Sequence, residues 1–184
     1  MAINLEKGQR VNVGLPKFVV GLGWDANSSN TGEDFDLDAS VFIMGENKKI
    51  ISDDYFVYYN NLKSPDGSVE HTGDNLTGAG DGDDESIKVD LSKINPSVNE
   101  ICIVVTIHKA DERRQNFGQV RNSFVRIYNP DNNEEILKYE LEEDFSTETA
   151  VEFGRLYKRN DEWKFEAVGV GQRGGLNDYL TKYN

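Results

Sequence analysis

Cysteine and histidine are scarce in this chain of 184 residues, which has one Cys and two His. A single cysteine, Cys102, excludes an intrachain disulfide framework and a zinc site built from several thiolates. His71 and His108 are far apart in the sequence, so a zinc site is disfavoured as well. Cys102 lies in the run ICIVV, which is typical of a buried strand where a lone cysteine behaves as a small apolar residue.

Basic residues are also few, since 20 Lys and Arg face 33 Asp and Glu and give a formal net charge of −13. Phosphate backbones and anionic membrane surfaces are bound through clustered Lys and Arg, so the charge disfavours a nucleic acid or lipid partner. The N-terminal MAINLEKGQR lacks the apolar stretch of a signal peptide. No apolar run approaches the roughly 18–20 residues of a membrane span. We expect a soluble, cytoplasmic protein that does not insert into the membrane.

Signatures of common enzymes are missing too. The sequence has no GxSxG element, no phosphate-binding P-loop and no dinucleotide fingerprint. Paired carboxylates such as Asp36 and Asp38 leave acid–base or metal-assisted hydrolysis open. We therefore assign no catalytic residues and favour a protein that is not an enzyme.

The absence of bases is local as well as general, because neither Lys nor Arg occurs from residue 64 to residue 87. This window is rich in acids and in glycine, which lets a loop bring its backbone carbonyls close to one centre. Carboxylates, amide oxygens and carbonyls are the ligands that Ca²⁺ collects, about 6–8 of them. The window is therefore either a calcium-binding loop or a solvated acidic loop. Its acids are Asp66, Glu70, Asp74, Asp81, Asp83, Asp84 and Glu85.

A second base-free window runs from residue 18 to residue 47 and contains the segment EDFDLDASVFIM. Alternation along a strand sends every other side chain to the same face. Phe35, Leu37, Ala39, Val41 and Ile43 would then share one face, and Asp34, Asp36 and Asp38 the other. Two acidic windows that meet in space predict a cation site more strongly than either window alone.

The calcium site that we expect is not an EF-hand. A loop beginning at Asp81 would place Ser86 where that motif requires glycine. The ligands must therefore come from several loops at one end of the fold. His71 either orients a carboxylate there or is a plain surface histidine, which is the commoner outcome. Arg113 and Arg114 form a small basic spot, more often a solvated turn than a partner contact.

Many short alternating segments separated by Gly, Pro and Asn turns predict an all-β sandwich of two mainly antiparallel sheets, with minor helix. We expect a single domain over 1–184. Expected strands include 48–51, 55–59, 86–91 and 100–108, and 151–158 should pair with 162–170 as a hairpin. A short helix or a loosely docked tail is expected at 176–183.

Long stretches of this sequence resemble the TerD family of bacterial tellurite-resistance and general stress proteins. The resemblance lies in GLGWD, in DFDLDAS and in SPDGSVEHTGDNLTGAGDGDDE, and it continues in QNFGQVRNSF and EWKFEAVGVG. No departure from the family pattern is apparent. It implies a cytoplasmic β-sandwich that binds Ca²⁺, two ions in all, through acidic loops at one end.

The resemblance also implies partners and candidate ligands. The partners would be other tellurite-resistance and stress proteins, including a TerC-like membrane protein. The function would be a calcium-dependent adaptor or scaffold in resistance to tellurite and other chemical stress. A metal-dependent sensor of a nucleotide-like small molecule and a metal-dependent hydrolase are the alternatives. The metal-site residues expected from the matching motifs are Asp25, Asp36, Asp38, Asn60, Asp66, Asp74, Asp81, Asp83, Asp84 and Glu85, with His71, Asn61 and Asn75 around them.

Overall fold

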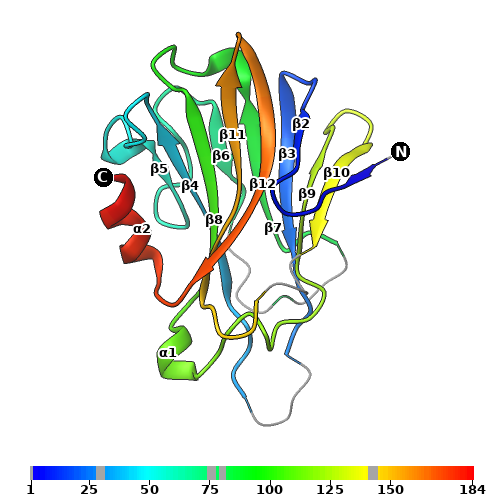
Figure 1. Ribbon diagram of the computed structural model, residues 1–184, viewed down its shortest axis with the longest axis vertical. Helices are drawn as coiled ribbons and strands as arrows, with labels where there is room; N and C mark the ends of the chain where they lie inside the picture. The colour runs from blue at the N-terminus through cyan, green and yellow to red at the C-terminus, as the bar shows by residue number, and fades with distance from the viewer. Residues whose placement is uncertain (1, 28–31, 74–77, 79–81, 141–144) are drawn as a thin grey trace.

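Two six-stranded sheets form the body of the protein in a computed structural model that describes residues 2–27, 32–73, 78, 82–140 and 145–184 (Figure 1). The first sheet has the order β1-β10-β9-β3-β7-β6 and the second the order β2-β12-β11-β8-β4-β5. The first comprises β1 (Ile3–Asn4), β10 (Glu135–Glu140), β9 (Phe124–Tyr128), β3 (Lys17–Gly23), β7 (Glu85–Asp90) and β6 (Val69–His71). The second comprises β2 (Arg10–Asn12), β12 (Glu162–Gln172), β11 (Ala150–Arg159), β8 (Glu100–Ile107), β4 (Leu37–Met44) and β5 (Phe56–Val57).

Strand pairing is antiparallel everywhere in these sheets except between β1 and β10. The predicted β-sandwich is therefore confirmed, as is the hairpin of β11 and β12. The predicted strand at 48–51 is wrong, because Lys48 takes a positive φ in a turn and only Ile50 forms an isolated bridge. The short strand β6, inside the acidic window, was not predicted.

The main core lies between the sheets and follows the alternation of the strands. In β4 the side chains of Leu37, Ala39, Val41 and Ile43 join this core, as the sequence predicted. The other face of β4 carries Asp38 near its start and Phe42 and Met44 toward its end; the latter two belong to a second apolar cluster. One strand thus supplies apolar side chains to both of its faces, and Asp38, near its start, is the one acidic residue within it.

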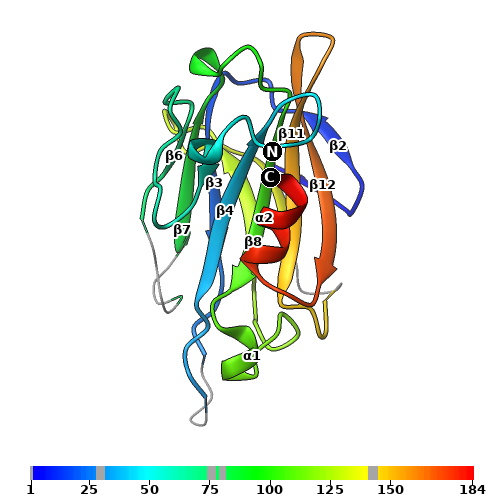
Figure 2. The ribbon, with the colours of Figure 1, turned by 90° about the vertical axis from the view of Figure 1, so that its left-hand side faces the viewer.

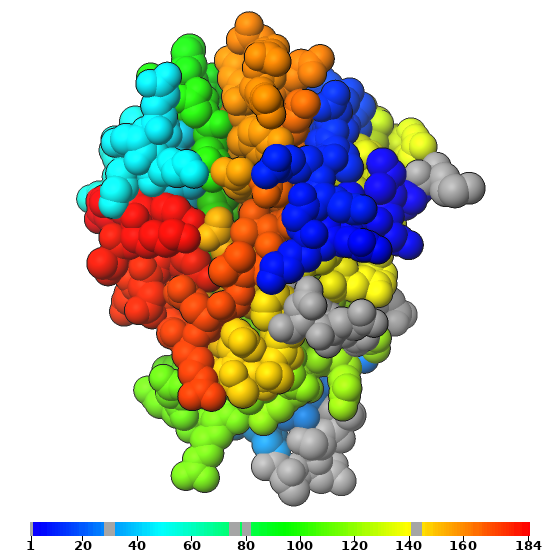
Figure 3. Space-filling view, in the orientation of Figure 1, coloured from blue at the N-terminus to red at the C-terminus, as the bar shows by residue number. Residues whose placement is uncertain are grey.

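Helix α2 (Leu176–Tyr183) covers that second cluster on the outer face of the second sheet (Figures 2 and 3). Tyr179 and Tyr183 are buried against Phe42, whose ring centroid lies 5.1 Å from that of Tyr183. The helix begins after Gly174 and Gly175 and ends at the C-terminus. The other α-helix, α1 (Ala110–Arg113), is a single turn, and among the described residues no helix is long and apolar enough to cross a membrane.

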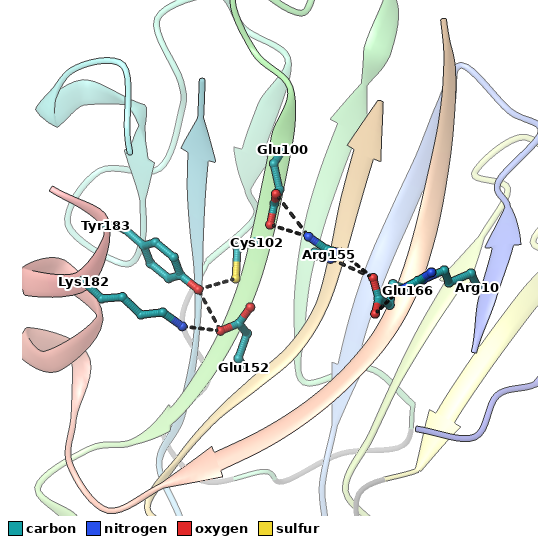
Figure 4. Close-up of polar contacts among 8 residues, drawn as sticks. All are labelled: Arg10, Glu100, Cys102, Glu152, Arg155, Glu166, Lys182 and Tyr183. Atoms are coloured by element: carbon teal, nitrogen blue, oxygen red, sulfur yellow. Dashed lines mark hydrogen bonds and ion pairs between the residues drawn. The ribbon is translucent and has the colours of Figure 1, made fainter. Parts of the chain in front are cut away.

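Polar contacts hold α2 to the sheet and hold the strands of the sheet to one another (Figure 4). The buried carboxylate of Glu152 accepts hydrogen bonds from Tyr183 Oη at 2.7 Å and from Lys182 Nζ at 3.0 Å. Beside it, Arg155 pairs with Glu166 at 2.7 Å and with Glu100 at 3.3 Å. A buried carboxylate is costly unless it is paired, so these partners make the docking of α2 specific.

Candidate metal site

Several acidic side chains gather at the end of the sandwich where β3 ends and where β4 and β7 begin, at the bottom of Figure 1. The register places Leu22 of β3 opposite Glu85 of β7 in the first sheet. The two sheets are joined here, because Glu85 Oε2 accepts a hydrogen bond from the backbone N–H of Ala39 at 2.8 Å. Both base-free windows therefore meet in space, as predicted.

Trp24 anchors the acidic segments to this end. Its indole N–H donates to the carbonyl of Phe35 at 3.0 Å, and its backbone N–H donates to Asp84 Oδ2 at 2.9 Å. Gly78 lies against the indole with φ of +65°, and a Cβ at that position would overlap the ring. A buried tryptophan thus fixes the end of β3, the start of β4 and part of the acidic loop in one place.

The surroundings of Asp84 change its pKa. Burial raises its pKa above the ordinary value, and the nearby charges of Asp83 and Asp25 raise it further against the hydrogen bond from Trp24. Asp25 itself is exposed and accepts a hydrogen bond from the Asn122 side chain. Like charges that raise the pKa of a neighbour favour either a proton or a cation at this point.

Asp83 has a resident counter-charge. Arg126 of β9 donates from Nε to Asp83 Oδ1 at 2.7 Å and from Nη2 to Oδ2 at 3.0 Å. The pKa of Arg126 is raised, first by its hydrogen bond with Asp83. A cation at Asp83 would therefore use the remaining lone pairs of the carboxylate or displace this guanidinium.

Asp36 and Asp38 are each only 6 % exposed, which the sequence did not predict for the solvent side of a strand. Asp38 Oδ2 lies 3.8 Å from His108 Nδ1, and Asp36 Oδ2 lies 3.8 Å from Arg113 Nη1. Arg113 makes its short contact with Glu33, at 2.8 Å. The loop that follows β8 therefore lies against the entry to β4 and partly balances its charge.

His71 is buried, so its interpretation as a plain surface histidine is wrong. It lies 3.4 Å from Glu85 Oε2 through Nε2, while its Nδ1 accepts a hydrogen bond from the N–H of Gly73. Because Nδ1 is an acceptor, Nε2 carries the ring proton and directs it to Glu85. His71 thus orients a carboxylate, which was the other interpretation of the sequence.

The remaining predicted residues are distributed differently. Asp66 lies by the opposite end of β7 from Glu85 and accepts four hydrogen bonds, from Ser64, Ser68 and the N–H of Asn95. Asn60 is exposed in a tight turn, and the Asn61 side chain donates to the carbonyls of Asp54 and Phe56. Asp74, Asn75 and Asp81 fall outside the described residues.

The donor chemistry of this end fits a hard cation such as calcium. Its side chains are carboxylates, and one of them, Asp84, has a pKa raised by burial and, less, by its acidic neighbours. Among the described residues, however, no three His, Cys, Asp or Glu side chains converge closely enough to hold a metal ion. Since Ca²⁺ collects about 6–8 oxygens, the described part supplies a portion of a coordination sphere.

Sequence patterns did not predict the two arginines that accompany these acids. Arg113 is 79 residues from Asp34, whose carbonyl it contacts, and Arg126 is 43 residues from Asp83. Arg113 was interpreted as part of a solvated turn, and its side chain is instead 21 % exposed against Glu33. Such long-range pairs leave no local signal in a single sequence.

The chain is similar over its whole length to known proteins. The profile of the TerD domain matches residues 1–183. General stress protein 16U of Bacillus subtilis (strain 168) is 54% identical over 188 residues, which cover 100% of this chain and 97% of that protein. Tellurium resistance protein TerD of Serratia marcescens is 52% identical, with 100% and 97% covered. The crystal structure of a homologue of telluride resistance protein from Streptomyces coelicolor A3(2) superposes with a TM-score of 0.76 at 23% identity, covering 91% of this chain and 96% of that one.

Proposed function

Since this chain belongs to the TerD family of tellurium-resistance and general stress proteins, we propose that it is a calcium-binding adaptor of the stress response. Its acidic end takes up Ca²⁺, two ions in all, and the loaded end forms the surface that partners bind. The partners that we propose are other proteins of the tellurium-resistance group, including a TerC-like membrane protein. No chemical step is assigned to the protein.

The observation that carries this proposal is the position of Asp84, whose pKa is raised first by burial and further by the nearby charges of Asp83 and Asp25. Crowded carboxylates repel one another, and a divalent cation would relieve that repulsion. Asp36 and Asp38 lie almost fully buried at the same end of the fold, and Glu85 joins the two sheets there. The acids therefore belong to a fixed part of the protein and not to a solvated loop alone.

Linkage gives the adaptor its mechanism. An ion that binds only the folded protein stabilises it by RT ln(1 + [L]/Kd), about 2.7 kcal/mol at a hundredfold excess over Kd. The residues that we propose as ligands in the described part are Asp25, Asp36, Asp38, Asp84 and Glu85, while Asp83 is shared with Arg126. Because these residues come from both sheets, the ion would make this end of the sandwich more rigid and less negative.

A calorimetric calcium titration of the chelator-stripped protein, with a thermal melt at each end point, tests the proposal. We expect saturable binding near the roughly 0.1–10 μM range of sensor sites and a raised Tm. The double variant Asp36→Asn/Asp38→Asn should lose most of the Tm rise. Its matched control is Asp161→Asn, a carboxylate that is 98% exposed in the β11–β12 turn. Absence of both heat and Tm shift in the unchanged protein would end the calcium proposal.

Two other functions remain as alternatives at the same site. A calcium ion there could bridge a nucleotide-like anion to the acidic surface, which would make the protein a metal-dependent sensor. Binding of such an anion only in the presence of calcium would favour the sensor over the adaptor. A hydrolase built on the same carboxylates would show turnover that disappears with EDTA and returns with Ca²⁺ or Mg²⁺.

A further inference from the structure

A lysine-lined pocket lies on the outer face of the first sheet, away from the acidic end. Its volume is about 220 Å³, and the residues that line it include Lys17, Lys88 and Lys93. Lys17 begins β3 and Asp90 ends β7, so the pocket lies six residues along β7 from Asp84. At about 3.3 Å per residue, it is roughly 20 Å from the acidic end.

Positive charge exceeds negative charge around this pocket. Lys17 and Lys93 share a single carboxylate oxygen, Asp90 Oδ2, at 3.7 and 3.8 Å. Glu70, which also lines the pocket, pairs with Lys63 at 3.6 Å. Three lysines and two carboxylates therefore line the pocket, a formal charge of +1 on a chain whose net charge is −13.

Lys88 is the cation with the most freedom to bind a ligand. It is exposed on β7, in register with Val19 on one side and Glu70 on the other. Among the ion pairs of the described residues none involves Lys88, and its cross-strand neighbour Glu70 pairs with Lys63. An ammonium group with three donors and no fixed partner is a ready site for an oxyanion.

The floor and walls of the pocket are apolar. Val19 faces outward from β3 and yet is only 5 % exposed, and Pro130, from the turn between β9 and β10, also lines the pocket. Ligand pockets are usually about 300–1,000 Å³, so this volume admits a single ring and not a larger molecule. An apolar floor beneath a cationic rim fits a small ligand with an apolar body and a charged end.

We propose that this pocket binds a small organic dianion, such as the phosphate monoester of a single-ring alcohol, with the phosphate at Lys17, Lys88 and Lys93 and the ring over Val19. The site needs no metal ion, because three lysines line it. It is independent of the calcium proposal, since none of its residues belongs to the acidic end.

NMR titration of the ¹⁵N-labelled protein with phenyl phosphate tests this site. We expect saturable shifts at the amides of Val19, Lys88 and Val89, unchanged by EDTA. Lys88→Gln/Lys93→Gln should weaken the affinity at least tenfold. Lys158→Gln, which removes an exposed lysine from the other sheet, should change it less than twofold. Inorganic phosphate and benzoate should both bind more weakly, because one lacks the ring and the other carries a single charge.

Each of these comparisons can overturn the proposal. Shifts that grow linearly without saturation, or that are equal in the double variant and the unchanged protein, would mean that lysines attract the anion only diffusely. Equal affinity for phenyl phosphate and inorganic phosphate would show that the apolar floor does not contribute to binding. Benzoate binding as tightly as phenyl phosphate would show that the pocket does not prefer a dianion over a monoanion.

Discussion

The Asp83 carboxylate lies directly over Gly21 of β3, so that a Cβ at position 21 would overlap it. Gly21 is also in register with Arg126, the arginine that binds Asp83 through two nitrogen atoms. The missing side chain of one strand therefore makes room for an ion pair that joins the acidic loop to β9.

Replacement of this glycine should displace the acid. Gly21→Ala is expected to push Asp83 off Arg126 and to lower the free energy of unfolding by about 1–3 kcal/mol, the usual cost of overpacking. Urea unfolding monitored by tryptophan fluorescence measures this change. Gly45→Ala is the control, because its Cβ would have only ordinary contacts, the nearest at 3.5 Å. An unfolding midpoint equal to that of the control would contradict the proposed fit.

Removal of the arginine should leave Asp83 without its counter-charge. The Asp83 side chain is 8% exposed and that of Arg126 is 28% exposed, so solvent screens this pair only in part. We expect Arg126→Gln to destabilise the fold by about 2–3 kcal/mol, below the roughly 3–5 kcal/mol of a fully buried pair. Arg126→Lys should be intermediate, because lysine cannot form the fork. Lys109→Gln, from an exposed pair with Glu112, should have almost no effect and serves as the control in the same urea assay.

The same arginine should influence calcium binding in the opposite direction. If Arg126 competes with a cation for Asp83, Arg126→Gln should bind Ca²⁺ more tightly although its fold is less stable. Calorimetry at equal ionic strength separates the two effects. Weaker calcium binding in this variant would instead mean that Arg126 orients Asp83 for the ion.

Glu152 should make stability depend on pH in a defined direction. Burial alone would raise its pKa, but the hydrogen bonds from Tyr183 and Lys182 prevail and hold it below the ordinary value of 4.5. A lowered folded-state pKa contributes stability that is present above the unfolded value and is lost as the pH falls through the folded value. The stability gap between the unchanged protein and Glu152→Gln should therefore be full at pH 7 and should close below about pH 4.

Urea midpoints at pH 7, 5, 4 and 3 for the two proteins give this gap directly. Because other carboxylates titrate equally in both proteins, their contributions cancel in the difference. A gap that stays constant across the whole range would show that Glu152 does not titrate with folding. Tyr183→Phe is a useful companion, since it removes one donor to Glu152 and keeps the ring packed on Phe42.

Cys102 should report the docking of α2. Its thiol is buried beneath Tyr183, at 3.7 Å from Tyr183 Oη, and burial raises its pKa well above the ordinary value. We expect no reaction with a disulfide reagent at pH 8 in the native protein, because the thiolate is the nucleophile. Truncation after Arg173, which removes α2, should make the thiol reactive while the sheets remain folded, as judged by circular dichroism. Rapid labelling of the full chain would show that α2 detaches readily.

The sequence predicted the parts of this fold that depend on local periodicity. Leu37 to Ile43 alternate as expected, and the turn at Asn160 and Asp161 closes the predicted hairpin. It did not predict β6, because three strand residues between acidic turns show no clear period. Nor did it predict that the backbone N–H of Ile50 donates a hydrogen bond to the carbonyl of Tyr183 in α2.

For the candidate site, the pattern of acidic residues in the sequence predicted the region. It could not predict which of these acids lie together in the fold. Asp66 was grouped with the metal ligands because it is acidic and lies in the right window. In the structure Asp66 lies in a turn and accepts hydrogen bonds from the hydroxyl groups of Ser64 and Ser68. These local bonds compete with metal binding for the lone pairs of the carboxylate. The partners of Asp83 and Asp36 are arginines distant in sequence, and only the folded chain brings them together.

The hydrogen bond from Ala39 to Glu85 has a consequence for the exchange of a backbone proton with solvent. Strand β5 pairs only with Val41 and Phe42, so in the described structure it does not reach Ala39, a buried residue at the same edge of the second sheet. Glu85 occupies that backbone donor from the neighbouring sheet, as a strand would. The amide proton of Ala39 should consequently exchange slowly with solvent, and Glu85→Ala should speed this exchange because the buried N–H loses its acceptor.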